Sequence, residues 1–234
     1  MRRLFILVAM MALCGCTTVR SFAAPEHRLP DRPLTIVVMR PDVEVSWLTA
    51  GGVAQPNADW TASARTALIG ALTAEQGARG NSVRLLGEQS GEAARLVADY
   101  EALHRTVADQ IAQFKYAGMI LPTKRGKFDW TLGPGVRQLG EMAGGGDYAL
   151  FLYARDSFAS DGRLALQIVG AALGGYVPGG ERFVYLSLID LRTGDIIWFN
   201  LLASARGDLR DPEGARATID TLMRTLPARA GARP

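Results

Sequence analysis

Few side chains of this 234-residue sequence belong to the types that commonly do chemistry, since it contains two cysteines and two histidines. That number is too small for a disulfide framework or a Cys/His zinc site. His27 lies in a proline-rich stretch, and His104 falls beside the apolar stripe of a predicted helix, where a surface position is expected rather than a general base. No nucleophile-elbow, phosphate-loop or dinucleotide glycine pattern follows a predicted strand, so we predict no catalytic residue, cofactor or metal.

Acidic side chains offer the one alternative to a non-catalytic interpretation. Paired carboxylates could carry out glycosidase-like chemistry or bind Ca²⁺. The candidates are Asp156, Asp161, Glu181, Asp190 and Asp195. They occur at predicted strand ends and turns, where aspartate commonly caps the backbone and keeps the surface soluble. A hydrolase is therefore an alternative hypothesis, not the favoured one.

The N-terminus has the organisation of an export signal. Two arginines precede an unbroken apolar run of ten residues, 4–13. This run is too short to cross a hydrocarbon core about 30 Å thick as a helix, and it fits a secretory signal peptide over residues 1–15. The cleavage region Leu13-Cys14-Gly15-Cys16 resembles the bacterial lipobox. The resemblance implies that Cys14 leaves with the signal and that Cys16 receives the lipid.

The residues after Cys16 suggest where the protein resides and what it does not bind. In lipoproteins of this kind, an aspartate after the lipidated cysteine favours the inner membrane, so Thr17 implies an outer-membrane location facing the periplasm. Residues 16–33 contain three prolines and are predicted to be a lipidated tether. Without the signal peptide, 24 basic and 23 acidic side chains remain, which lacks the positive charge of a nucleic-acid binder.

Hydrophobic patterning beyond the tether predicts one α/β domain over residues 34–227, with a mixed sheet of about five strands and helices packed on it. A C-terminal β-hairpin followed by a helix closes the domain, and residues 228–234 are expected to form a disordered tail. The predicted strands are 34–39, 82–86, 147–154, 182–191 and 195–204. The predicted helices are 57–80, 91–114, 136–142 and 213–226.

An apolar segment at residues 164–177 interrupts the path between two predicted strands. Gly170 and Gly174 have the spacing that allows close helix approach, and Tyr176 follows them. Three interpretations remain open at this point: a packed core element, an interface with another subunit, or a membrane-contacting insertion. An interaction segment is the interpretation that would give these residues a function.

The predicted hairpin also supports a family resemblance. Gly146-Asp147-Tyr148-Ala149 enters one strand, and Asp190, Thr193, Gly194 and Trp198 mark a strand end, a Thr-Gly turn and a return strand. This pattern resembles the CsgG-like curli-secretion lipoproteins, and it is similar to the penicillin-binding-protein activator lipoproteins and the amino-terminal domain of TolB. The resemblance implies the fold and a structural hairpin, and it implies no catalytic residue.

Together these observations favour a lipid-anchored periplasmic lipoprotein that acts as a non-catalytic adaptor or assembly factor. Its expected partners are the membrane, through the N-terminal lipid, and another envelope protein, with a homo-oligomer as a further option and no nucleic acid. An oligomeric export or secretion component with an apolar insertion at 157–181 is the first alternative. A periplasmic hydrolase that uses carboxylates is the second.

Overall fold

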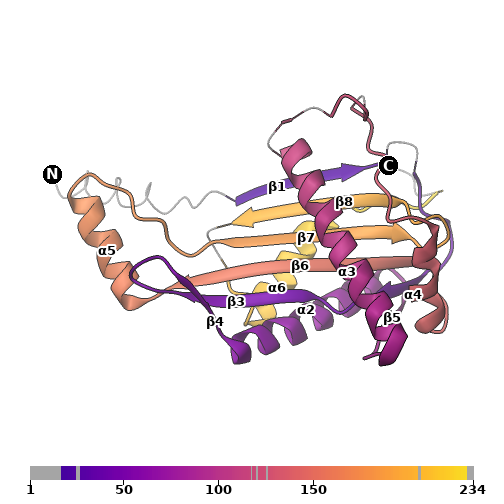
Figure 1. The fold of residues 1–234 in the computed structure, drawn as a ribbon, viewed down its shortest axis with the longest axis horizontal. Coiled ribbons are helices and arrows are strands. Elements are labelled where there is room, and N and C mark those ends of the chain that lie inside the picture. The colour runs from indigo at the N-terminus through magenta and orange to yellow at the C-terminus, as the bar shows by residue number, and fades with distance from the viewer. Residues whose placement is uncertain are drawn as a thin grey trace.

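The computed structural model describes residues 17–230, apart from residues 25–26, 117, 120, 125 and 205–206. The expected signal peptide, the lipidation of Cys16 and the last four residues of the expected tail lie outside the described residues. Within them, the chain forms a single α/β domain whose central sheet is covered by helices on both faces (Figure 1). The predicted fold class is confirmed.

Eight strands of the described chain form one mixed sheet, in the order β1-β8-β7-β6-β2-β5, with β3 also pairing β6 and β4 pairing β3. The pairs β2–β5, β2–β6 and β3–β6 are parallel. The pairs β6–β7, β7–β8 and β8–β1 are antiparallel. The strands are β1 Thr17–Ala23, β2 Thr35–Val38, β3 Asp42–Leu48, β4 Ala54–Pro56, β5 Ser82–Leu85, β6 Tyr148–Ala159, β7 Arg182–Asp190 and β8 Ile196–Ser204.

The expected strand count of about five is too low because β1, β3 and β4 were not predicted. β4 lies in a Gly- and Pro-containing stretch that was expected to be a loop, and it exists only as the partner of β3. β1 occupies the start of the expected tether, where its seven residues pair with β8. β1 and β3 are set by long-range pairing with β8 and β6, which a local sequence pattern does not record.

Helices divide the core into two layers. On one face lie α2 Ala58–Ala78 and α6 Pro212–Met223; on the other lie α3 Gly91–Ile111 and α4 Arg137–Met142. α3 continues as a π-helical turn, Ala112–Tyr116, and a 3₁₀ turn, Pro134–Val136, precedes α4. α5, Asp161–Ala172, projects from one end of the sheet and covers neither face (Figure 1).

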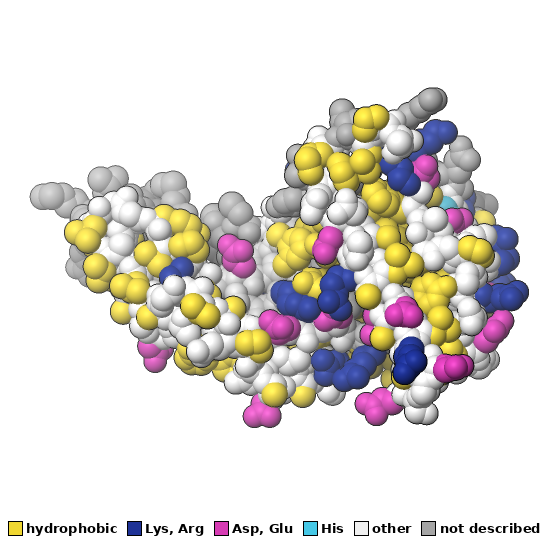
Figure 2. Space-filling view, in the orientation of Figure 1, with side chains coloured by type: hydrophobic (Ala, Val, Ile, Leu, Met, Phe, Trp, Pro, Cys, Tyr) yellow, Lys and Arg dark blue, Asp and Glu magenta, His cyan; other side chains and the backbone are white. Residues whose placement is uncertain are grey.

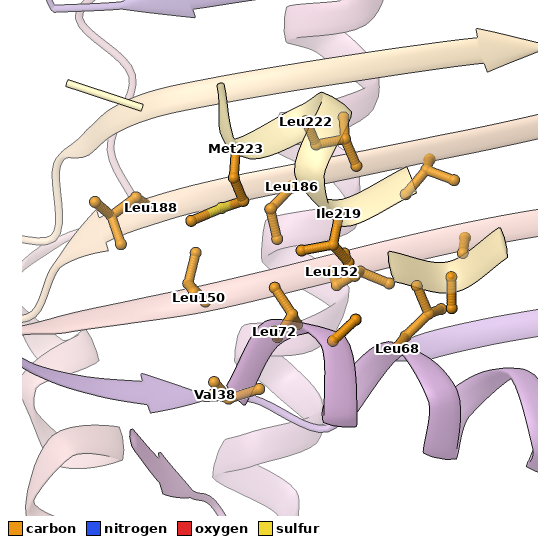
Figure 3. Close-up of a cluster of buried hydrophobic side chains, with 14 of the residues drawn as sticks. Val38, Leu68, Leu72, Leu150, Leu152, Leu186, Leu188, Ile219, Leu222 and Met223 are labelled. Carbon is orange, nitrogen blue, oxygen red and sulfur yellow. The ribbon is translucent and has the colours of Figure 1, made fainter. Parts of the chain in front are cut away.

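The side chains of β6 alternate between these two layers. Leu150 and Leu152 point toward α2 and α6, where they meet Leu68, Leu72 and Ile219 (Figure 3). Ala149 and Phe151 belong to the layer under α3 and α4. This alternation follows from the two-residue period of a strand, and it explains why the segment is almost wholly apolar.

Capping residues explain where three helices begin. The Asn57 side chain accepts a hydrogen bond from the Trp60 amide at the start of α2, as predicted. Asp211 caps α6 directly before Pro212, and Ser160 caps α5. Such side chains satisfy amides that have no partner within the helix.

The two expected unstructured segments are partly ordered. In the tether, β1 is followed by Leu29, which is buried and pairs with Arg229 near the C-terminus. Arg229 also donates from Nη2 to the Arg79 carbonyl and the Asn81 side chain. Residues 228–230 are therefore held against the domain and are not a free tail.

Candidate functional site

The sheet register defines two ends of the molecule. Thr17 pairs with Ser204, Ser204 with Arg182, Arg182 with Asp156, and Asp156 with Val45. We call this row the anchor end, because Thr17 directly follows Cys16 in the sequence. The opposite end, where β2 and β6 begin and β7 ends, is called the far end. These two ends carry different chemistry.

Exposed apolar side chains are concentrated at the anchor end. Nine of the twelve exposed large hydrophobic residues in the described chain lie on α5 and the segment after it, in the β3–β4 hairpin, or in the first half of β1. They are Val19, Trp47, Val53, Leu164, Leu166, Ile168, Val169, Leu173 and Tyr176. Figure 2 shows the hydrophobic side chains that gather over the projecting α5. Exposed apolar patches of this kind are common at interaction sites.

α5 and the segment that returns from it form a projecting arm, residues 161–180. The return segment is held to the helix by hydrogen bonds from the Gly175 amide to the Gly170 carbonyl and from Arg163 Nε to the Pro178 carbonyl. No residue of α5 is buried, and Ile168, Leu173 and Tyr176 are 72%, 82% and 85% exposed. The packed-core interpretation of 164–177 is therefore wrong.

The two glycines of the arm have separate roles. α5 ends at Ala172, and Gly174 takes a positive φ of 79° just beyond its C-cap. This is the left-handed glycine that commonly terminates a helix. A Cβ on Gly170 would lie 2.9 Å from the Cγ2 atom of Val177. Gly170 and Gly174 thus each have a role in the fold of the arm itself.

An aromatic cluster forms the base of the arm. The rings of Trp47 and Trp60 lie 5.3 Å apart, and Trp60 meets Phe158 at 5.8 Å. The Arg210 guanidinium lies 4.3 Å from the Trp60 ring centroid and 3.8 Å from that of Phe158, while it forms an ion pair with Asp208. Cation–π contacts of this kind fix the rings in place. The base is therefore rigid, with Trp47 exposed at its rim.

The five candidate carboxylates do not converge on one site. Asp156 is buried and accepts hydrogen bonds from Arg182 and from the Leu209 amide. Burial raises the pKa of Asp156, while the Arg182 charge opposes that shift. Glu181 lines the same small pocket as Asp156 at the anchor end, Asp161 begins α5, and Asp190 and Asp195 lie in the turn at the far end. Among the residues the structure describes, no group of three His, Cys, Asp or Glu side chains could hold a metal ion.

The hairpin residues play the structural parts expected of them. The Asp190 carboxylate accepts hydrogen bonds from the Arg192 and Thr193 amides, which closes the turn between β7 and β8. Gly194 has a φ of 84°, and a Cβ there would lie 2.1 Å from the Gly133 carbonyl oxygen. Trp198 is fully buried, with Nε1 3.4 Å from the Thr225 hydroxyl. Gly194 thus lies in the turn and Trp198 in the core beneath the return strand.

His104 was expected at the surface, but it is buried in the core. Its Nε2 atom lies 2.9 Å from the Ser187 hydroxyl, and its ring stacks on Phe151 at 4.5 Å. Burial lowers the pKa of His104 to about 3, and the nearby Arg105 charge adds to the effect. Ser187 is fully buried too. This histidine–serine pair has no access for a substrate, so its role is structural.

At the far end, a cavity of about 550 Å³ lies between α4, the segment before β2 and the entry to β6. Sequence reasoning did not predict it, because its residues come from four separate stretches of the chain. Its polar lining includes His27, three carboxylates and the arginines Arg28, Arg32, Arg137 and Arg192. The expected aspartate entry to β6 contributes, because Asp147 accepts two hydrogen bonds from Arg32 and one from the Thr35 amide.

No helix in the described part of the chain has both the length and the apolar character needed to cross a membrane. No protein-family model and no curated protein sequence matches the chain. Among solved structures, it is similar to PelC from Paraburkholderia phytofirmans, a dodecamer. A point variant of PelC gives a TM-score of 0.41 and a second PelC structure 0.38, each at 15% identity over 92% of this chain and 100% of that chain. Likeness at this level shows neither a shared function nor a shared assembly.

Proposed function

We propose that this chain is a lipid-anchored lipoprotein of the outer membrane, which acts in the periplasm as a non-catalytic adaptor or assembly factor. The observation that carries the proposal is the clustering of exposed apolar side chains at the end of the sheet where Cys16 joins the domain. In the described chain, the candidate carboxylates are divided between the two ends of the sheet and the one buried His–Ser pair is inaccessible, which favours binding over catalysis.

The position of β1 brings the proposed lipid close to the arm. Thr17 is already paired in the sheet, and consecutive Cα atoms are about 3.8 Å apart. A lipid on Cys16 would therefore hold the anchor end against the bilayer, without a long tether between them. The arm adds apolar contacts with the bilayer beside this lipid anchor in the proposal.

The chemistry of the arm suits the membrane interface. α5 carries Leu164, Ile168 and Val169 as exposed apolar side chains, while Tyr176 and Trp47 are the aromatic types that favour the headgroup region. The helix is only 12 residues long, so it would lie in the interface and not cross the bilayer. The far end then faces the periplasm and is free for a partner.

Lipidation is tested at Cys16. In the Cys16→Ser variant we expect no incorporation of labelled fatty acid and release of the washed protein from membranes. Retention of this variant in the outer membrane after washing would contradict the proposed anchor.

Outer-membrane sorting is tested separately with Thr17→Asp, which should move the lipidated protein toward the inner membrane. The Oγ1 atom of Thr17 also lies 3.1 Å from the Ser204 hydroxyl. Thr17→Ser keeps a hydroxyl at this position and is therefore the matched control. An unchanged distribution of Thr17→Asp would remove Thr17 as a sorting signal.

The arm is tested in the Cys16→Ser background, with flotation on vesicles of phosphatidylethanolamine and phosphatidylglycerol. We expect binding at high lipid concentration that is lost in Ile168→Asp and Leu173→Asp, because a charge at the interface opposes burial of the apolar face. Leu103→Asp is the control, since Leu103 is an exposed leucine on α3, away from the arm. Equal loss in all three variants would contradict a specific role for the arm.

Self-association is the second candidate role for the arm, because the same exposed apolar face could pack on another copy of the chain. Sedimentation velocity separates the two candidates. If Leu173→Asp abolishes vesicle binding and leaves the sedimentation coefficient unchanged, the arm binds lipid. If it dissociates an oligomer and vesicle binding is unaffected, the arm is a subunit interface and the chain fits the oligomeric alternative better.

A further inference from the structure

The far-end pocket has the size and lining of a ligand site. Its volume of about 550 Å³ lies in the range of small-molecule sites. Its floor is glycine-rich, and a Cβ on Gly146 would lie 2.4 Å from the Cγ2 atom of Val37. Gly145 adopts a φ of 107°, a conformation that other residues rarely take. Close packing against Val37 thus excludes a side chain at Gly146, and the entry to β6 contributes glycines to the lining of the pocket.

His27 brings an unpartnered polar atom to this pocket. Its ring lies edge-on to Tyr148 at 6.2 Å, and its Nε2 atom is buried without a hydrogen-bond partner among the described residues. Burial lowers the pKa of His27, so the ring is neutral at neutral pH and has one N–H to donate. A buried polar atom without a partner costs about 1–3 kcal/mol, which a bound ligand would relieve.

The arginines of the pocket carry positive charges whose ion pairs within the described chain are weak or absent. Arg137 and Arg192 are largely exposed, and each pairs with a carboxylate close by in the sequence. Exposed pairs of this kind are weak, so both guanidinium groups can turn toward a ligand at little cost. Arg28 makes no ion pair or hydrogen bond with any described residue. It is the cation that a ligand would meet without displacing another group.

We propose that the far-end pocket binds an oxyanion, the carboxylate or phosphate group of a soluble ligand, with Arg28 and His27 as the binding residues. Guanidinium groups recognise both anions through paired, charge-assisted hydrogen bonds. The neutral His27 donates an additional hydrogen bond from Nε2. This site lies at the end of the sheet opposite the proposed lipid, so it does not depend on membrane attachment.

The two histidines allow a direct test by NMR of the full-length lipoprotein in detergent micelles, with ¹³C-labelled histidine. His27 reports on the pocket, while the buried His104 is an internal reference. The probes are inorganic phosphate, N-acetyl-trialanine with a free carboxyl terminus, and the same peptide amidated, all at constant ionic strength. We expect a saturable shift of the His27 resonances with one or both anions and none with the amide.

Arg28→Gln should weaken this binding about tenfold, because it removes a charge-assisted hydrogen bond. Arg28→Lys should recover part of it, and Arg216→Gln, an exposed change on α6, should leave it unaffected. Arg28 is exposed, so the variant is expected to melt as the parent does. A response to phosphate alone would identify a phosphate ligand, and a response to the free carboxylate alone would identify a carboxylate ligand. Binding that survives in Arg28→Gln, or a His27 shift equal with the amide, would overturn the proposal.

Discussion

His104 shows how a single buried residue can set the acid sensitivity of the domain. Its ring is neutral in the folded state because burial lowers its pKa to about 3, whereas the unfolded chain protonates histidine near pH 6.5. Between those values the unfolded state binds more protons, so stability falls as the pH falls. At higher pH this effect is absent, because both states are neutral.

We therefore expect the domain to be about 2 kcal/mol less stable at pH 5 than at pH 8, measured by urea denaturation. His104→Gln keeps an amide near the Ser187 hydroxyl and cannot be protonated, so it should remove the larger part of this pH dependence, while His27, whose pKa burial also lowers, contributes the remainder with the same sign. Carboxylates with lowered pKa values, such as Asp147 and Asp208, titrate at lower pH and do not affect this window. An equal slope in the variant would contradict the assignment to His104.

Asp156 and Arg182 form the second buried polar pair. Arg182 also donates from Nη1 to the Thr218 hydroxyl on α6, so the pair joins β6, β7 and that helix. In Arg182→Met, the Asp156 carboxylate would keep only the Leu209 amide as a partner. We expect a loss of about 3–5 kcal/mol in the free energy of unfolding at pH 7, as for other buried charges left unpaired.

This loss should decrease at low pH. The pKa of Asp156 is already raised by burial, so its protonation on acidification removes the uncompensated charge in the variant. Arg137→Met is the control, because the Arg137–Glu141 pair is exposed and contributes little. A deficit that does not change with pH would mean that lost packing, not the buried charge, explains the effect.

At the scale of elements, the β7–β8 hairpin tests whether a turn glycine is required by its conformation or by its surroundings. Gly194 and Gly174 both have positive φ values, 84° and 79°, but only Gly194 faces a backbone carbonyl where a Cβ would lie. Gly174→Ala should cost about 1 kcal/mol from conformation alone. Gly194→Ala should cost about 1–3 kcal/mol more, measured by thermal melting. Equal effects would contradict the steric argument.

Trp198 tests the core beneath the same hairpin. It is fully buried in the layer under α2 and α6, so truncation to alanine leaves a large cavity. We expect Trp198→Ala to lower the free energy of unfolding by about 3–5 kcal/mol. Trp47→Ala is the matched control, because Trp47 is partly exposed at the base of the arm. Near-parental melting of Trp198→Ala would contradict the burial of this ring.

Elements with a strong local pattern could be predicted from the sequence, and those held by distant partners could not. Asn57 and Pro212 marked the starts of α2 and α6, and the β-branched and aromatic residues on both sides of Arg192-Thr193-Gly194 marked the hairpin. β1 has few buried residues, and its hydrogen bonds go to a strand about 180 residues away, which no local window contains. The apolar composition of residues 164–177 was apparent from the sequence. Their exposure was not, because it depends on α5 projecting beyond the end of the sheet.

At the scale of the whole molecule, the distribution of apolar and charged side chains gives the domain two distinct ends. The anchor end exposes the arm and Trp47, whereas the far end gathers arginines around His27. The apolar segment of the arm is visible in the sequence, but its proximity to Trp47 and the far-end grouping are not, because they bring together residues from separate strands and loops. The expectation of a non-catalytic protein came from residue types, whereas the pocket required the fold to bring Arg28 and Arg192 together.

Replacement of residues 164–177 by a short Gly-Ser linker tests this two-ended arrangement. β6 and β7 are already joined at the base of the arm, where the Ser157 amide bonds to the Glu181 carbonyl and the Glu181 amide to the Ser157 hydroxyl. Antiparallel strands need only about two to five residues to connect them.

Because α5 buries no side chain, we expect the replaced protein to keep its circular dichroism spectrum and to lose less than about 1 kcal/mol of stability. In the Cys16→Ser background it should no longer bind vesicles, while the His27 response to anions at the far end stays unchanged. Global unfolding would mean that the arm stabilises the domain after all. A folded protein that still binds vesicles would show that the membrane contact lies elsewhere on the anchor end, with Val19, Trp47 and Val53 as the remaining apolar side chains.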